Sequence, residues 1–308
     1  MEYTNILKQA YESARKHKAM WFLGMLVASG GANFSNVGNF NTSDFKSSEM
    51  DPVLNSASQF MESYWWVLII VGILFLLLMI VMIVLHNVAI GGLYYGAEQA
   101  RLKKKVTFGD MFRAGSHTFW KVLGTNLLIG AVFGGVGMLI AIPLAILAFT
   151  VVGLIVVIPA VLVLIVLAIP VMAAVGVLTN YAFQYMTLRK QGVIDSLKMG
   201  WLMLKNNVLD SFVMFLFMML VGIGFAIVSI LIAVFIILPF AIIGFIAYNS
   251  AGWVPVITVV LIGLLVLWIV MTFIKGIRNA YTFNVWHLTF VELEKNTQKL
   301  PAIAKSKK

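Results

Sequence analysis

The sequence predicts an all-α membrane protein, a polytopic bundle of six transmembrane helices arranged as three hairpins, each preceded by a cytoplasmic interfacial amphipathic helix. Composition is the first observation behind this prediction, because 61% of the 308 residues are hydrophobic and only 11% are charged. Soluble domains average about 45–50% apolar and about 25% charged residues. Secondly, residues 122–188 and 211–274 carry no charge, and each stretch is long enough for two spans of about 20 residues. Together these observations exclude a soluble globular enzyme, a disordered tail and a nucleic-acid-binding domain, despite the net charge of +10.

The N-terminal segment contains the weakest predicted span. In residues 3–14, apolar side chains recur at helical spacing on one face and polar side chains cover the other, which predicts an amphipathic helix. A helix over residues 19–32 would then rise only about 21 Å, against roughly 30 Å of membrane hydrocarbon. We expect this segment to be the first span, with a signal peptide or a re-entrant segment as the alternatives.

The remaining spans have clearer sequence signals. Residues 64–85 are almost entirely apolar and begin with Trp65 and Trp66, which are expected to anchor the helix at the membrane interface. Within the two uncharged stretches, helix-breaking residues are expected to mark span ends, because proline cannot continue the helical hydrogen-bond ladder. These residues are Pro143, Gly153, Pro159, Pro239, Asn249, Gly252 and Pro255. Pro170 is expected to kink the fourth span.

The distribution of basic residues predicts the orientation. Of the 22 Lys and Arg residues, all except Lys46 fall in the N-terminal segment, in residues 98–121, in residues 189–207 or after residue 274. A six-span arrangement places all four regions on one side of the membrane. Because basic loops remain in the cytoplasm, we expect both termini to be cytoplasmic and residues 33–63 to be external. The expected location is the plasma membrane of a prokaryote.

Two segments that precede predicted hairpins share a pattern. Residues 107–121 and 192–206, aligned with an offset of 85, share D-x-[FL]-[RK]-x-G. Thr107 and Gly192 occupy the expected N-cap positions, and each Asp lies in the first turn, where a carboxylate favours the positive end of a helix. The pattern predicts one transmembrane domain over residues 1–295 with three units, near 1–97, 98–188 and 189–295. A basic cytoplasmic tail, residues 296–308, follows.

The first and third units also resemble a known group. The helix that begins Ile6-Leu-Lys-Gln-Ala-Tyr and runs into His17-Lys-Ala-Met-Trp-Phe-Leu-Gly resembles the start of a broad prokaryotic six-span family. That family includes the membrane domain of glycerophosphoryl diester phosphodiesterases and many stand-alone proteins of unknown function. Residues 192–207 are similar to the matching region there. The resemblance implies a stand-alone membrane domain without phosphodiesterase activity, because the soluble domain that carries that chemistry is absent from this sequence.

The side chains offer little for catalysis. The chain has no cysteine, and its four histidines are scattered without a zinc-binding spacing. Asp210 is expected to be a solvated helix start, and His86 an interfacial residue, because neither falls in the middle of a predicted span. Glycines of the pattern Gly130-x-x-x-Gly134 are expected to let helices pack closely within the bundle, with a dimer face as the alternative. We therefore predict no enzymatic activity, no cofactor and no metal site.

Two classes of function remain. The first is a non-catalytic membrane module, acting as a scaffold, a lipid-interacting element or an accessory subunit, and the second is a transporter or channel for uncharged or amphiphilic solutes. We favour the first, because the predicted spans lack the charged residues that usually couple transport. The expected partners are anionic membrane lipids and an unidentified membrane protein, not nucleic acid. The predicted lipid contacts are the basic residues Arg101, Lys103, Lys104, Lys105, Arg113, Lys121 and Lys198.

Overall fold

The computed structural model describes residues 1–30, 47–251 and 253–298, and within these ranges every element is a helix. The all-α class is therefore confirmed. The expected external residues 33–46, including Lys46, the hairpin residue Gly252 and most of the expected basic tail lie outside the described residues. The helices are α1 (Tyr3–Lys16), α2 (Ala19–Gly30), α3 (Ser47–Arg101), α4 (Phe108–Ala148), α5 (Val151–Leu188), α6 (Val193–Asn206), α7 (Val208–Ala251) and α8 (Trp253–Gln298).

Five helical segments are long and apolar enough to cross a membrane, as in a multi-pass membrane protein. They are Ser63–Arg101, Phe108–Ala148, Gly153–Leu188, Val208–Ser250 and Pro255–Lys295. Upstream of the first of these, residues 47–63 are also helical, and the non-helical residue Tyr64 (φ −127°, ψ 27°) separates them from the rest of α3 by a kink. The first predicted span, residues 19–32, is not confirmed by length, because α2 contains only 12 residues and rises about 18 Å.

Helix α2 is a packed element instead. Met20 and Leu23 are fully buried, and α2 lies against α3 and α8. The Gly24 backbone approaches the Gly276 backbone so closely that a Cβ atom on Gly24 would lie 2.2 Å from the Gly276 carbonyl oxygen. The Asn279 amide also donates a hydrogen bond of 2.9 Å to the Gly24 carbonyl oxygen. Helix α2 is therefore part of the buried core.

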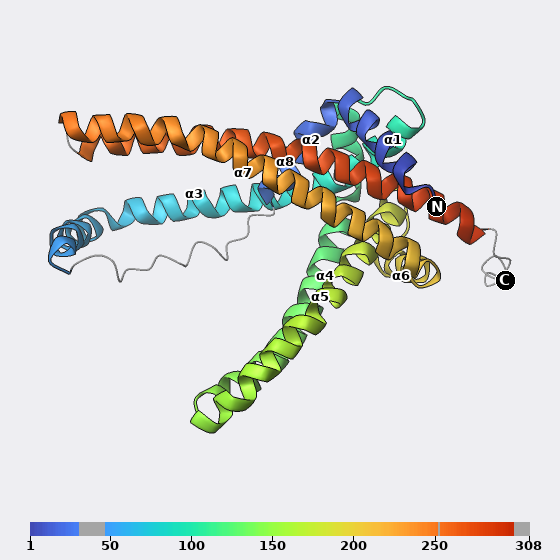
Figure 1. The fold of residues 1–308 in the computed structure, drawn as a ribbon, viewed down its shortest axis with the longest axis horizontal. Helices are drawn as coiled ribbons and strands as arrows, with labels where there is room; N and C mark the ends of the chain where they lie inside the picture. Colours follow the sequence, from blue (N-terminus) through green and yellow to red (C-terminus); the bar gives the residue numbers. More distant parts are fainter. Residues whose placement is uncertain (31–46, 252, 299–308) are drawn as a thin grey trace.

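The buried core lies at one end of the long helices, where α1, α2 and α6 gather around them (Figure 1). We call this cluster of buried residues the hub. Its members come from all eight helices, so the three short helices serve mainly to fill the space between the long ones. The largest fully buried side chains of the hub are Tyr94, Tyr181, Phe290, Met20, Leu23, Leu93, Met111, Met186, Met203, Met214, Leu293 and His287.

Away from the hub, the long helices form hairpins that diverge. The α4–α5 hairpin leaves the hub in a different direction from the α7–α8 hairpin and α3 (Figure 1), and the most apolar window of each candidate span is unburied. The expected close packing through Gly130 and Gly134 is wrong for this chain, because a Cβ atom on either residue would meet no atom within 4 Å. Because these surfaces are apolar, lipid is their natural solvent.

Only two of the three predicted interfacial helices are separate helices. Helices α1 and α6 end before the next helix starts, whereas residues 108–121 continue into the span as the first part of α4. The aligned positions explain the difference. Asn207 leaves the helical conformation (φ −133°, ψ 43°) and ends α6, whereas Val122, at the equivalent position of α4, is fully buried within the helix. Asparagine favours such ends because its side chain competes for backbone hydrogen bonds.

The predicted N-caps are confirmed, and the predicted helix breaks are confirmed only in part. Thr107 precedes α4 and accepts a hydrogen bond of 3.3 Å from the Asp110 backbone N–H, and Gly192 precedes α6. Pro143, Pro159 and Pro239 lie inside helices instead of ending them, because membrane helices tolerate interior proline. Gly153 and Pro255 lie in the first turns of α5 and α8 and Asn249 in the last turn of α7, as expected for span ends. Pro170 lies inside α5, where it was expected.

Candidate anion-binding groove

The turn between α3 and α4 presents a run of basic side chains. Helix α3 ends in a Schellman motif, because the Lys104 N–H donates to the Gln99 carbonyl and the Lys103 N–H donates to the Ala100 carbonyl, both at 3.0 Å. This motif places Lys103 in the left-handed conformation (φ 54°), a position that glycine usually occupies. A lysine there costs about 1 kcal/mol or more relative to glycine.

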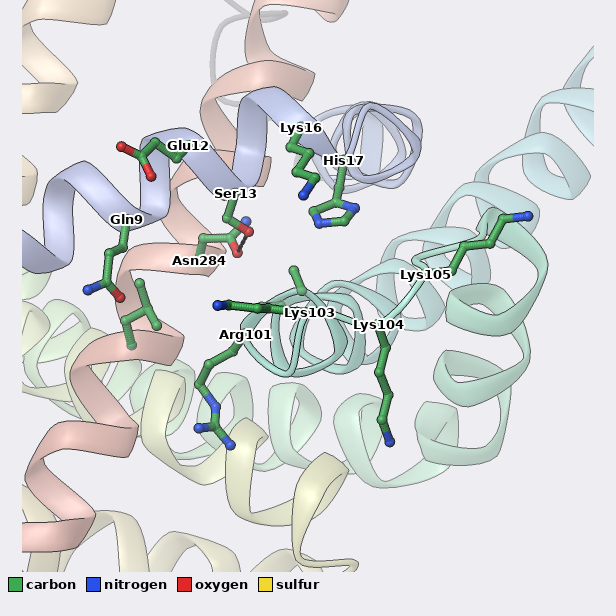
Figure 2. Close-up of a pocket in the computed structure, with 13 residues that line it drawn as sticks. Gln9, Glu12, Ser13, Lys16, His17, Arg101, Lys103, Lys104, Lys105 and Asn284 are labelled. Carbon is green, nitrogen blue, oxygen red and sulfur yellow. Dashed lines mark hydrogen bonds between the residues drawn. The ribbon is translucent and has the colours of Figure 1, made fainter.

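These basic side chains line a groove between the α3–α4 turn, α1 and α8 (Figure 2). The groove has a volume of about 440 Å³, within the range of small-ligand sites. From α1 and the residue after it come Lys16 and His17, and α8 contributes Asn284. The basic lining residues are Lys16, His17, Arg101, Lys103, Lys104 and Lys105.

The groove carries an excess of positive charge. Among the described residues, no carboxylate forms an ion pair with Lys16, Lys103, Lys104 or Lys105. The one carboxylate in the lining, Glu12, points away from these lysines in Figure 2. Burial and the neighbouring Lys16 ammonium lower the pKa of His17, as expected where cations gather. Such an arrangement attracts a ligand with several negative charges or a single phosphate.

A network of polar side chains, partly exposed at Arg101 and buried at His287, connects the groove to the hub. The Glu98 carboxylate accepts two hydrogen bonds of 2.7 Å from the Arg101 guanidinium and lies 2.8 Å from Nε2 of His287. Nδ1 of His287 lies 3.1 Å from the Gln184 side-chain oxygen. The network therefore joins α3, α5 and α8 and fixes the direction in which α3 ends, so that the following lysines reach the groove.

A second cavity continues along α1 and α8. It has a volume of about 510 Å³ and shares Gln9, Arg101 and Leu288 with the basic groove. Its lining includes Glu2 and Glu292 as well as Lys295. Mixed charge makes this part less selective for anions than the groove formed by the lysines.

The structure brings together four of the seven predicted lipid contacts. Arg101, Lys103, Lys104 and Lys105 line the groove. Arg113 and Lys198 are exposed on α4 and α6 and do not line it. Lys121 is engaged elsewhere, because its ammonium donates to the carbonyl oxygens of Lys190 and Gln191 at 3.1 and 3.0 Å.

Sequence reasoning missed the contributions of α1 and α8 to the groove. Ser13 and Asn284 meet across it, with a hydrogen bond of 2.9 Å from the Ser13 hydroxyl to the Asn284 side-chain oxygen. Only the polar face of residues 3–14 signalled that α1 had a wet side. No local pattern indicates that residues so far apart in the chain line one cavity.

Asp210 and His86 also have structural partners. The Tyr3 hydroxyl donates a hydrogen bond of 2.5 Å to the Asp210 carboxylate, and this bond, together with burial, raises the pKa of Tyr3 to about 12. His86 Nδ1 lies 2.9 Å from the Val27 carbonyl oxygen. Asp210 therefore joins α7 to α1 rather than being only a solvated helix start, and His86 joins α3 to α2.

Comparison with known proteins adds one assignment. A family model matches residues 19–293, from α2 to the last turns of α8. The chain belongs to DUF7544, a family of unknown function. No curated protein and no solved structure matches this DUF7544 chain. The resemblance to the membrane domain of glycerophosphoryl diester phosphodiesterases therefore receives no support from these comparisons.

Proposed function

We propose that this DUF7544 protein is a non-catalytic membrane module whose basic groove binds the phosphate groups of anionic lipids at the cytoplasmic leaflet. The observation that carries the proposal is the convergence of six basic side chains from α1, α3 and the following turn on one cavity of about 440 Å³. A basic residue near an anionic membrane surface gains roughly 1 kcal/mol. Several of them, held around one cavity, favour an anionic headgroup over a zwitterionic one.

Two helical segments of the hub, in α4 and α6, have the features of helices at the membrane interface. Trp120 on α4 and Trp201 on α6 are 77% and 55% exposed, and tryptophan is enriched at the level of lipid headgroups. These residues lie on the helical segments that bear Arg113 and Lys198. The opposite faces of the same segments bury Met111, Gly115 and Gly200 in the hub, so each segment has one face for protein and one for the interface.

The proposal includes an orientation, with both termini in the cytoplasm of a prokaryotic cell. Because the five candidate spans are odd in number, this orientation requires the N-terminal segment that contains α2 to cross the membrane as well. Because the chain has no cysteine, single cysteines test this. Ser116 is exposed beside the groove-side end of α4 and Phe149 is 91% exposed at the α4–α5 turn. On intact cells, Phe149→Cys is expected to react with an impermeant maleimide and Ser116→Cys only after permeabilisation; the reverse pattern contradicts the orientation.

The binding proposal is tested with the full chain in neutral detergent, titrated with dioctanoyl phosphatidylglycerol and with dioctanoyl phosphatidylcholine. Lys103→Gln/Lys104→Gln/Lys105→Gln removes three charges from the groove. Lys8→Gln/Lys190→Gln/Lys205→Gln removes three from exposed positions that line neither the groove nor the adjoining cavity and is the matched control. At roughly 1 kcal/mol per charge, the first variant is expected to weaken phosphatidylglycerol binding at least tenfold, whereas the control changes it less than twofold.

The same titration identifies a failure of the proposal. Equal affinity of the wild type for both lipids, or equal losses in both triple variants, would show that the groove does not select anionic headgroups. Flux of an uncharged solute through liposomes containing the wild-type chain would instead favour the transporter alternative.

A further inference from the structure

Another cavity, separate from the two described above, lies on a different side of α8, where the hairpins separate. It is enclosed by α5, α7 and α8 and has a volume of about 370 Å³. Arg278 and Thr282 of α8 line it, whereas the basic groove is lined by Asn284 and Leu288. Figure 1 shows that the α4–α5 hairpin diverges from α7 and α8 as it leaves the hub. We call this cavity the inter-hairpin cleft.

Apolar side chains and glycines form much of the wall of the inter-hairpin cleft. Met172, Met218 and Met219 line it, and methionine side chains adapt to irregular apolar ligands. Gly176 of α5 and Gly222 of α7 also line it, and a Cβ atom on either glycine would meet no atom within 4 Å. The glycines therefore leave open space in the cleft rather than serving a contact between helices.

Polar side chains and one positive charge also line the inter-hairpin cleft. The side-chain oxygen of Asn180 accepts a hydrogen bond of 2.5 Å from Tyr94, and the Asn279 amide donates to Gly24, so both are engaged within the protein. Arg278 is exposed, and among the described residues no carboxylate forms an ion pair with its guanidinium. An unpaired guanidinium beside apolar membrane helices is costly unless an anion or water reaches it.

We infer that the inter-hairpin cleft binds one anionic phospholipid from the surrounding leaflet, with its phosphate at Arg278 and an acyl chain along Gly176 and Met172 of α5. This direction leads away from the hub into the space between the diverging hairpins, because α5 and α8 both run toward the hub and Met172 and Arg278 are their first lining residues. Arginine pairs with phosphate through two parallel hydrogen bonds. This site is independent of the basic groove, since the two cavities share no lining residue.

Native mass spectrometry of the full chain tests this inference. The protein is released from micelles that contain equal amounts of dioleoyl phosphatidylglycerol and dioleoyl phosphatidylcholine, and the retained lipids are counted. Arg278→Gln removes the charge, and Gly222→Leu fills the cleft without a clash. Lys205→Gln and Gly224→Leu are the controls, because Lys205 is exposed on α6 and Gly224 faces open space beyond the cleft lining.

The wild type and both controls are expected to retain one phosphatidylglycerol in addition to the lipid held by the basic groove, and the occupancy of this additional lipid is expected to fall at least fivefold in Arg278→Gln and in Gly222→Leu. Unchanged melting of the lipid-free variants shows that they fold. Retention that does not differ between the test and control variants would overturn the inference. Displacement of the retained phosphatidylglycerol by free oleate added to the same micelles would also overturn it. The groove variant Lys103→Gln/Lys104→Gln/Lys105→Gln is expected to keep this lipid, so the two proposals fail separately.

Discussion

The α3–α4 junction and the α5–α6 junction share one local plan but use their charges differently. Each begins with a helix that ends at a lysine in the left-handed conformation, Lys103 (φ 54°) or Lys190 (φ 56°). Each continues into a capped helix with an aspartate in its first turn and a glycine five residues later. At the first junction the lysines face an open groove, whereas the second is closed by contacts within the protein.

Those closing contacts come from neighbours that are distant in sequence. Lys121 of α4 donates to the carbonyl oxygens of Lys190 and Gln191. Arg189 pairs with Glu294 of α8 at 2.6 Å, and this hydrogen bond raises the pKa of Arg189. The comparison teaches that the same backbone plan gives either a structural closure or a set of available charges, depending on what packs against it.

The largest expected difference concerns the two aligned glycines. A Cβ atom on Gly115 would lie 2.0 Å from the Val88 carbonyl oxygen, whereas one on Gly200 would lie 3.0 Å from the Leu178 carbonyl oxygen. Gly115→Ala forces two backbones apart and is expected to cost about 3 kcal/mol or more, at the upper end of overpacking effects. Gly200→Ala is expected to change stability by less than about 1 kcal/mol, because small shifts relieve the contact and alanine favours helix. Thermal unfolding in neutral detergent measures both, and equal losses would contradict the difference.

The closure by Lys121 is expected to have the next largest effect. Lys121→Met keeps the length of the side chain but removes the donor, leaving two carbonyl groups of the α5–α6 turn without it. The expected loss is about 1–2 kcal/mol, because the hydrogen bonds involve a charged donor but the turn is partly exposed. Lys105→Met at the open junction serves as the control and is expected to change the free energy of unfolding by less than about 0.5 kcal/mol. A stable Lys121→Met variant would show that this contact is not a closure.

Substitutions at the two helix caps are expected to change the free energy of unfolding by smaller amounts and in opposite directions. Thr107→Ala removes the side chain that accepts the Asp110 N–H and is expected to cost about 1 kcal/mol. Gly192→Ser adds a capping hydroxyl at a position with extended backbone (φ −71°, ψ 168°) and room for a Cβ atom. It is expected to stabilise the protein by a few tenths of a kcal/mol. Changes of the same sign in unfolding experiments would refute the equivalence of the two caps.

Local sequence signals predicted the fold class and the helix starts, because hydropathy and caps depend on neighbouring residues. They did not predict that residues 108–121 belong to α4, since that outcome depended on Val122 continuing a helix that Asn207 ends at the aligned position. Divergence of the hairpins was also not predictable. The glycine pattern around Gly130 looks the same whether or not another helix packs against it.

The candidate groove was predictable only in its local part. The run from Arg101 to Lys105 indicated an anion site because like charges were clustered in the sequence. The contributions of Lys16 and Asn284 depend on how α1 and α8 pack in the hub, and the link between Glu98 and His287 spans the whole chain. The backbone contacts of Lys121 were not predictable for the same reason, because a lysine that binds backbone carbonyls cannot be distinguished by sequence from one that faces lipid.

The most direct test of the central claim compares Lys103→Gly with Lys190→Gly. Both substitutions relieve a left-handed lysine in the same way and are expected to leave the protein as stable as the wild type, or more stable by about 0.5 kcal/mol. Affinity for dioctanoyl phosphatidylglycerol is then measured for each variant in neutral detergent. Only Lys103→Gly is expected to weaken binding, by about fivefold for the loss of one charge near 1 kcal/mol. Equal affinities of the two variants would contradict a function for the groove in binding anionic lipid.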